Sequence, residues 1–317
     1  MNQNHIEIRN SKFGIRKIGF LSSARGAALA LTLALSGAAQ ATVLFTEDFN
    51  FSGLLSANGW TAISGAGTSA ITTQSVTGLT YSGHPGSGVG NAAGFVATGE
   101  DDHKSFTAQS AGTVYASALI NLSAAQSGGD YFFALNNGTT SFIARLYAKS
   151  SGTGYVLGIG KSTSTVLYDT TVRNFNTTYL VVLKYSFLSS TADDTVSLFV
   201  EPVLGGSEGS ATLTTGSTIA DTASLGFAMV RQGSSTAAPT GRIDAIRVAT
   251  TWAEVTASGA PTFSISTSSL SGFSTTEGTA STAQTFTLSG ANLTANLTRS
   301  EEHTSELQSR QYLVCRL

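Results

Sequence analysis

The sequence predicts an all-β protein whose main domain is an antiparallel β-sandwich, and three observations support this fold class. Short runs rich in β-branched and aromatic residues recur about every 10–15 residues, separated by clusters of Gly, Ser, Asn and Asp. Only 11% of the 317 residues are charged and 41% are hydrophobic, whereas a typical globular domain is about 25% charged. No helical period is sustained after residue 41. We therefore expect about ten or more strands, packed as two sheets, between residues 43 and 255.

Ten runs are the clearest strand candidates, and several show the period of two that places alternate side chains on opposite sheet faces. In FIARLYAK, Phe142, Ala144 and Leu146 share one face, and Arg145 and Tyr147 share the other. The segments NNGTT and STADDT predict hairpin turns, because Asn and Gly reach positive φ at low cost. In chain order the runs are TVLFTEDF, TVYASALINL, DYFFALN, SFIARLYAK, GYVLGIGKS, TVLYDTT, TYLVVLKYSF, DTVSLFVEP, SLGFAMVRQ and GRIDAIRVAT.

Residues 1–41 have the pattern of a secretory signal peptide. A basic segment precedes the apolar run GAALALTLALSGAAQA at residues 26–41, which ends in the small-x-small sequence that signal peptidase reads. This run predicts a helix shorter than the roughly 20 residues that span a bilayer. A buried N-terminal helix is the alternative interpretation. We expect the mature chain to begin at Thr42 and to be secreted or held at a bacterial cell surface.

The C-terminal stretch RSEEHTSELQSRQYLVCRL, residues 299–317, differs in character from the Ser/Thr/Gly-rich chain before it. Back-translation of residues 299–309 and 313–317 matches a widely used sequencing-library adapter without a mismatch. We interpret 299–317 as an adapter-derived artefact and expect the natural protein to continue beyond Thr298. Cys315, which is the only cysteine, and His303 then leave the set of candidate nucleophiles and metal ligands.

The remaining residues, 42–298, form one large and one small predicted region. They carry nine basic and fifteen acidic side chains, and this excess of negative charge argues against non-specific binding of nucleic acid or anionic membranes. The segment TASGAP at 256–261 is predicted to be a linker. Residues 262–298 again alternate like strands, but fewer than about 40 residues rarely bury a stable core, so we expect an incomplete second β-module.

Residues 43–255 resemble the concanavalin A-like lectin/glucanase sandwiches, laminin-G-like jelly rolls found in exported bacterial surface proteins. The motifs that carry the resemblance are LFTEDFN and NGW near the start, GDYFFALN and DTVSLFVEP within, and RIDAIRVATTWAEV at the close. The resemblance implies that the first and last strands are neighbours. Residues 262–298 resemble the start of an Ig-like repeat that follows such domains. The resemblance to concanavalin A-like sandwiches also implies a link to glycans, because relatives include glycan-binding modules, adhesins and accessory domains of secreted hydrolases.

Catalytic patterns are weak in this sequence. Glycosidases of the resembled fold carry an E-x-D-x-x-E triplet on one strand, and no such triplet occurs here. The cluster GEDDH at 99–103 is interpreted as a solvated loop, with a metal or catalytic role as the alternative. GYVLGIGKS lacks the first glycine of a phosphate-binding loop, since Tyr155 stands at that position. His84 in GHPGSG has no partner at zinc-ligand spacing and is interpreted as part of a surface turn. Hydrolysis by this domain is therefore not expected.

A structural calcium ion is the first of two candidate sites. If the first and last strands are neighbours, Glu47 or Asp48 lies near Asp244, and carboxylates suit calcium. The alternative is that these residues are ordinary polar groups at strand ends. No other cofactor is predicted.

A glycan-binding face is the second candidate site. If apolar residues such as Val181 point inward, then Arg145, Tyr147, Lys184 and Phe199 point outward. Aromatic rings flanked by hydrogen-bond donors suit the apolar faces and hydroxyl edges of sugars. The alternative is a solvated or loop-covered sheet face.

Together these patterns predict a non-catalytic module of a larger exported protein that binds an extracellular polysaccharide or cell-surface glycan, or that serves as an adhesive or spacer element. The alternative function is that of an accessory domain of a secreted glycosidase or nuclease whose catalytic domain lies downstream.

Overall fold

The computed structural model describes residues 42–74, 78–138, 142–216, 218–259, 262–267, 269, 271 and 285–291. The predicted signal peptide at 1–41, the adapter-like segment at 299–317 and most of 262–298 lie outside the described residues. Within the described residues, no helix is both long enough and apolar enough to cross a membrane.

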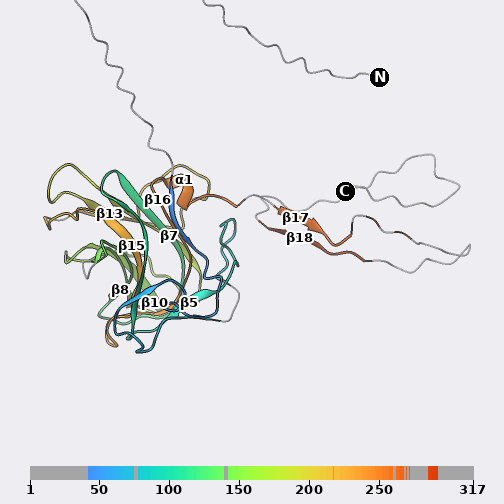
Figure 1. Cartoon of the computed structure of the whole chain (residues 1–317), viewed down its shortest axis with the longest axis horizontal. Helices are drawn as coiled ribbons and strands as arrows, with labels where there is room; N and C mark the ends of the chain where they lie inside the picture. The colour runs from blue at the N-terminus through green and yellow to red at the C-terminus, as the bar shows by residue number, and fades with distance from the viewer. Residues whose placement is uncertain are drawn as a thin grey trace, which may run out of the picture. The chain divides into compact units, whose positions relative to one another are not determined.

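The described part of the main domain consists of two antiparallel sheets, which confirms the predicted β-sandwich (Figure 1). The nine-stranded sheet has β1 paired with β16 and otherwise follows the order β14-β13-β12-β7-β16-β5-β4-β2. Its strands are β1 (Val43–Glu47), β2 (Gly53–Leu54), β4 (Thr72–Gln74), β5 (Ala92–Phe95), β7 (Thr113–Ala124), β12 (Tyr179–Ser186), β13 (Thr195–Val200), β14 (Leu213–Gly216) and β16 (Thr240–Ala249).

The seven-stranded sheet follows the order β11-β10-β9-β8-β15-β6-β3. Its strands are β3 (Thr61–Ser64), β6 (Asp101–Gln109), β8 (Asp130–Asn136), β9 (Phe142–Ser151), β10 (Gly154–Lys161), β11 (Leu167–Tyr168) and β15 (Leu225–Val230). All ten runs predicted from the sequence are strands in the structure. β1 pairs with β16, with Glu47 opposite Ile246, so the first strand and the last strand of the sandwich are neighbours as the resemblance implied.

The hydrophobic core lies between the two sheets and takes side chains from both. Phe95 of β5 and Phe132 of β8 stack across the interface with ring centroids 5.5 Å apart. Leu146 of β9 and Leu183 of β12 are fully buried in the same cluster. These inward-facing positions follow the period of two that the sequence showed, because alternate residues of each strand face the partner sheet.

The outer face of the nine-stranded sheet is covered over part of its length. At one end, the short helix α1 (Trp252–Val255) places Trp252 against Phe199, with ring centroids 4.7 Å apart. Figure 1 shows α1 beside β16. In the middle, the segment 78–90 packs Leu79 against Leu119 and Ala245. We call the part of the sheet under α1 and segment 78–90 the covered part.

A β-bulge in β16 decides which of its residues face outward. Asp244 pairs with Leu119 and Arg247 pairs with Ser117, so two residues of β16 oppose a single residue of β7. Ala245, at φ 50°, occupies the bulge. A bulge reverses the alternation locally, and it therefore places Arg247 on the same outer face as Arg242, although simple alternation would separate them.

Six further strands, β2 to β6 and β14, were not predicted. Most are short and rich in Ser, Thr, Ala and Gly, so their apolar alternation is weak. The interpretation of GEDDH as a solvated loop is wrong. Asp101 and Asp102 begin β6, which is paired with β3 on one side and β15 on the other. Glu100 and Asp102 are 2% and 0% exposed. Asp102 pairs with the core residue Val230, so its side chain faces the interior between the sheets. His84, interpreted as part of a surface turn, is 2% exposed.

Beyond the sandwich, β17 (Thr262–Ile265) and β18 (Leu288–Ala291) form an antiparallel pair. The prediction that residues 262–298 begin an Ig-like module stays a prediction. In the predicted linker, Thr256 is fully buried and its carbonyl accepts a hydrogen bond from the Gly205 amide at 2.7 Å. The Gly259 amide donates to the Gly83 carbonyl at 2.8 Å. Residues 256–259 are therefore bonded to the loops of the sandwich.

Candidate functional site

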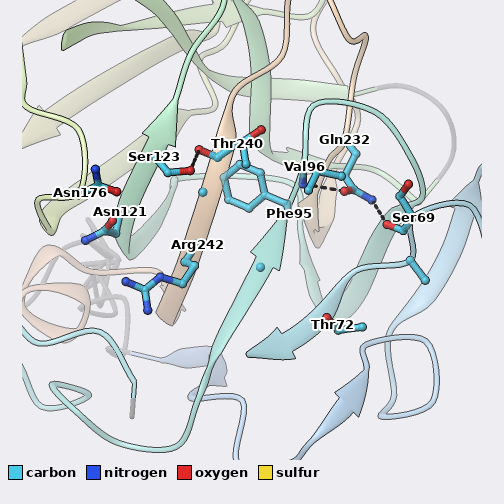
Figure 2. A pocket seen from close by; sticks show the side chains of 13 residues that line it. Ser69, Thr72, Phe95, Val96, Asn121, Ser123, Asn176, Gln232, Thr240 and Arg242 are labelled. Atoms are coloured by element: carbon cyan, nitrogen blue, oxygen red, sulfur yellow. Dashed lines mark hydrogen bonds between the residues drawn. The ribbon is translucent and has the colours of Figure 1, made fainter. Parts of the chain in front are cut away.

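A polar pocket of about 440 Å³ lies on the outer face of the nine-stranded sheet, at the end that neither α1 nor segment 78–90 covers. Figure 2 shows its thirteen lining residues, which come from six separate stretches of the chain. They are Ser69, Ala70, Thr72, Gly94, Phe95, Val96, Asn121, Ser123, Asn176, Gln232, Thr240, Gly241 and Arg242. Its volume falls within the range of about 300–1,000 Å³ that is usual for ligand pockets.

The floor of the pocket is a row of residues across four adjacent strands. Thr72 of β4 pairs with Gly94 of β5, Gly94 pairs with Arg242 of β16, and Arg242 pairs with Asn121 of β7. Their side chains share the outer face because directly paired residues point to the same side of a sheet. Gly94 has no side chain, so space remains above the middle of the row between Thr72 and Arg242.

Gln232 fixes one side of the pocket (Figure 2). Its side-chain oxygen accepts a hydrogen bond from the Val96 amide at 2.7 Å, and its Nε2 donates to the carbonyls of Ser69 and Glu100 at 2.8 and 3.0 Å. The residue is only 3% exposed. The buried Gln232 side chain thus links its own loop to the loop that contains Ser69 and to the loop at residues 96–100. These three hydrogen bonds use most of the hydrogen-bonding capacity of the side chain.

Asn176 and Ser123 form the opposite side. The Asn176 amide donates to the Leu122 carbonyl at 2.7 Å and holds the loop against β7, with Asn176 at φ 59°. Asparagine tolerates this left-handed conformation better than most residues. Ser123 Oγ donates to the Thr240 carbonyl at 3.3 Å. Among the described residues, the Asn176 side chain has no hydrogen-bond partner, so it is available to a ligand.

Arg242 is the only charged residue among the thirteen that line the pocket. It is half-buried, and within the described part of the chain its guanidinium makes no ion pair, side-chain hydrogen bond or ring contact. Six other cations form ion pairs, namely Lys104, Lys161, Arg173, Lys184, Arg231 and Arg247. The remaining two, Arg145 and Lys149, lie over tyrosine rings. Arg242 therefore stands apart from the other eight described cations.

The lining holds no side chain that acts as a general acid or base at neutral pH, so its Ser and Thr hydroxyls have no base in the lining to activate them as nucleophiles. It includes no Asp, Glu, His, Lys, Tyr or Cys. Glycoside hydrolysis usually requires two carboxyl groups beside the scissile bond. The pocket can supply an arginine, two asparagines and hydroxyl groups, which is a set of hydrogen-bonding groups without a proton-transfer pair.

The residues of the predicted calcium site are engaged in other contacts. Glu47 accepts hydrogen bonds from Trp60 Nε1 at 3.1 Å and from Lys104 Nζ at 2.7 Å. Asp48 is paired with Arg247 at 2.7 Å. Asp244 is fully buried and accepts the Leu79 and Ala245 amides at 2.7 and 2.6 Å. Burial raises its pKa to about 7, with Asp48 adding to the effect. The calcium ion stays a prediction.

The four residues of the predicted glycan-binding face lie on two different sheets. Arg145 and Tyr147 are on β9 of the seven-stranded sheet, and Lys184 and Phe199 are on β12 and β13 of the nine-stranded sheet. The structure therefore brings them together only in pairs, on opposite sides of the sandwich.

These four residues face outward as predicted, but their side chains are already engaged in contacts within the protein. Tyr147 is 7% exposed and packs against Tyr131, with ring centroids 5.4 Å apart. Phe199 is 4% exposed beneath Trp252. Lys184 Nζ lies 2.6 Å from the Glu208 carboxylate. The covered-face alternative therefore describes the surroundings of Phe199.

A second acidic group outside these predictions gathers Asp193, Asp194 and Asp221. Asp221 accepts the amides of Asp193 and Asp194 at 3.1 Å and pairs with the buried Lys161. Asp194 accepts the Tyr185 hydroxyl at 2.6 Å. Since these carboxylates already accept hydrogen bonds from donors of the protein, we interpret the three residues as a structural cluster.

Sequence reasoning missed the pocket, although Arg242 stood within a motif used for the resemblance. The available signal was the run GRIDAI, where an arginine occupies an outward position on a predicted strand. Its neighbours Gly94 and Asn121 come from distant segments whose pairing the sequence does not show.

Comparisons with known proteins add the following findings. No family model matches the chain, and no curated protein matches it. Among solved structures, an endo-1,3-beta-glucanase from Streptomyces sioyaensis is 11% identical with a TM-score of 0.39, covering 67% of this chain and 96% of that one. Alginate lyase vAL-1 from Chlorella virus is 10% identical with a TM-score of 0.40, covering 65% and 99%. A heptameric SAP-like pentraxin from Limulus polyphemus is 14% identical with a TM-score of 0.34, covering 49% and 73%. At these values the likenesses assign no ligand or activity to this chain.

Proposed function

We propose that this chain is an exported module that binds glycans, without cleaving them, in the pocket on the nine-stranded sheet. The observation that carries the proposal is the composition of the pocket, which holds no acid–base pair and combines asparagine and hydroxyl groups with an arginine that has no partner among the described residues. Sugars present many hydroxyl groups, each of which donates and accepts hydrogen bonds. A pocket of this size with a few convergent polar groups matches that demand.

The predicted signal peptide supports the same function, because a secreted or surface-held protein meets extracellular polysaccharide. The excess of acidic side chains within 42–298 is also consistent with a ligand other than nucleic acid. A role as an adhesive module of a larger surface protein of the concanavalin A-like class is part of this proposal.

The proposal is tested by measuring binding of the full chain to a panel of neutral and acidic polysaccharides. Gly94→Phe places a ring over the floor of the pocket and is expected to abolish binding. Leu188→Phe adds the same ring at an exposed position, 52% exposed and outside the lining, and is expected to bind like the wild type. Thermal unfolding of both variants shows whether each is folded.

Product release is measured on the same polysaccharides, as new reducing ends and as new unsaturated ends. We expect binding without either product. Undiminished binding by a folded Gly94→Phe variant would remove the pocket from the proposal, and product release by the wild type would replace binding with catalysis.

A further inference from the structure

We infer that the pocket selects acidic glycans and that Arg242 binds the carboxylate of a uronic acid unit. This inference rests on the proposed function, because it names the class of sugar that the same pocket takes. It is carried by the position of Arg242 on the pocket floor and by the contrast between this residue and the other described cations.

Arg242 lacks a counter-charge among the described residues. Removing a cation partly from water costs free energy unless an anion or hydrogen-bond acceptor replaces the water. The other half-buried arginines on the sandwich are compensated. Arg231 lies 2.8 Å from Asp130, and Arg247 lies 2.7 Å from Asp48. Arg242 is half-buried and has no such partner among the described residues, so an anionic ligand would supply it.

The guanidinium group of Arg242 suits a carboxylate. Its planar fork donates two parallel hydrogen bonds to one carboxylate, which gives both strength and orientation. Figure 2 shows the Arg242 side chain extending along the floor on the side of Asn121 and Asn176. Asn121 is fixed because its Nδ2 donates to Thr178 Oγ1 at 3.2 Å. The amide groups beside the arginine are thus placed to bond the ring hydroxyls next to a bound carboxylate.

The pocket lining offers no exposed aromatic ring on which a sugar could stack. Neutral sugars are commonly held by aromatic side chains that present an exposed face. The only aromatic residue that lines the pocket is Phe95, which is 1% exposed and stacks on Phe132 in the core. Without an exposed ring, affinity must come from hydrogen bonds and charge, and the charge is positive.

The experiment compares ligands that differ in a single group. The probes are galacturonate oligomers of defined length, the same oligomers with every carboxylate methyl-esterified, and a sulfated neutral glycan. Mannuronate, guluronate and glucuronate oligomers are included so that the result does not depend on one uronic acid. Affinity is measured by titration calorimetry with the full chain.

The variants isolate the guanidinium. Arg242→Gln is expected to weaken uronate binding about 10- to 100-fold, and Arg242→Lys to fall between it and the wild type, because lysine keeps the charge but loses the fork. Lys149→Gln is the matched control. It removes one positive charge from a half-buried cation outside the pocket lining, and uronate affinity is expected to stay within about twofold.

The outcomes separate this inference from the proposed function. Tighter binding of uronates than of their methyl esters, lost in Arg242→Gln, supports the inference. Equal binding of esters and free acids overturns it while leaving glycan binding intact. Binding of the sulfated glycan alone overturns the assignment to a carboxylate. Binding of no glycan at all overturns the proposed function itself.

Discussion

Arg242 and Arg247 lie on the same strand and the same outer face of the nine-stranded sheet, yet their surroundings are opposite. Arg247 belongs to the covered part, where it donates to Asp48 at 2.7 Å. Arg242 stands in an open pocket without a partner among the described residues. The difference does not come from the strand or from the residue type. It comes from segment 78–90, which crosses the sheet above Arg247 and does not reach the pocket that Arg242 lines.

Segment 78–90 covers Arg247 at short range. A methyl group added at Gly86 would come within 2.7 Å of Ala245 Cβ and 2.8 Å of Arg247 Nη2, and one added at Gly78 would come within 2.6 Å of Asp244 Oδ2. Glycine is required at both positions because the backbone approaches the sheet so closely. No described segment lies as close over Arg242, and this end of the sheet is therefore free to take a ligand.

The largest expected effect comes from disturbing the bulge that puts both arginines on one face. Ala245→Val places a β-branched residue at φ 50°, which valine strongly disfavours, and adds volume at a fully buried position. We expect the free energy of unfolding to fall by about 2–4 kcal/mol. Ala245→Gly adopts the same φ without strain and is expected to change it by about 1 kcal/mol or less.

Denaturant titrations that follow the fluorescence of the buried Trp60 and Trp252 measure both variants. Equal losses of unfolding free energy for valine and glycine would contradict this prediction, because glycine accepts the positive φ of residue 245 without strain whereas valine does not.

A second comparison replaces each arginine in turn. Arg247→Met leaves Asp48 unpaired beside the buried Asp244, and we expect a loss of about 1–3 kcal/mol in unfolding free energy. Arg242→Met removes a cation with no partner among the described residues, and we expect a change within about 0.5 kcal/mol. Thermal or denaturant unfolding checks both values. A large destabilisation by Arg242→Met would show that this arginine has a structural role, and the contrast with Arg247 would fail.

The smallest expected effect depends on pH and concerns Asp102, a buried carboxyl near the loops that Gln232 ties together. Neither of its side-chain oxygens has a hydrogen-bond donor among the described residues. Burial raises the pKa of Asp102 to about 7, and the neighbouring Glu100 and Asp101 carboxyls add to the effect. In the unfolded chain the pKa is about 3.9. Between these values the folded protein holds a proton that the unfolded chain releases, so stability falls as pH rises from about 4 to about 7.

Asp102→Asn removes this titration. We expect the variant to match the wild type near pH 4 and to exceed its unfolding free energy by at least about 1–2 kcal/mol at pH 8. Unfolding of both proteins is measured at the two pH values, and other titrating groups such as His84 cancel in the difference. A stability difference that is the same at both pH values would contradict the raised pKa. Unchanged ligand affinity between pH 5 and 8 would show that the pocket is independent of this carboxyl.

The sequence was sufficient for the fold class and for the positions of the long apolar strands. Period-two alternation identified the strands that carry large apolar side chains, because one face of each strand must be buried against the other sheet. It also predicted that Arg145, Lys184 and Phe199 face outward. It failed for β6, where the run DDHKSFTAQ is too polar to read as a strand. Pairing with β3 and β15 overrides that composition.

The candidate site was decided by tertiary structure alone. The sequence by itself determined that Arg242 stands on a strand with alternating side chains, and that the chain offers few cations. It did not determine that Gly94 and Asn121 would flank this arginine, because strand pairing between distant segments leaves no local pattern. Nor did it show the bulge at Ala245, which turns Arg247 to the same face, or the path of segment 78–90, which covers one arginine and leaves the other open. Local side-chain chemistry specifies strands, whereas the surroundings of a side chain depend on which distant segments pack over it.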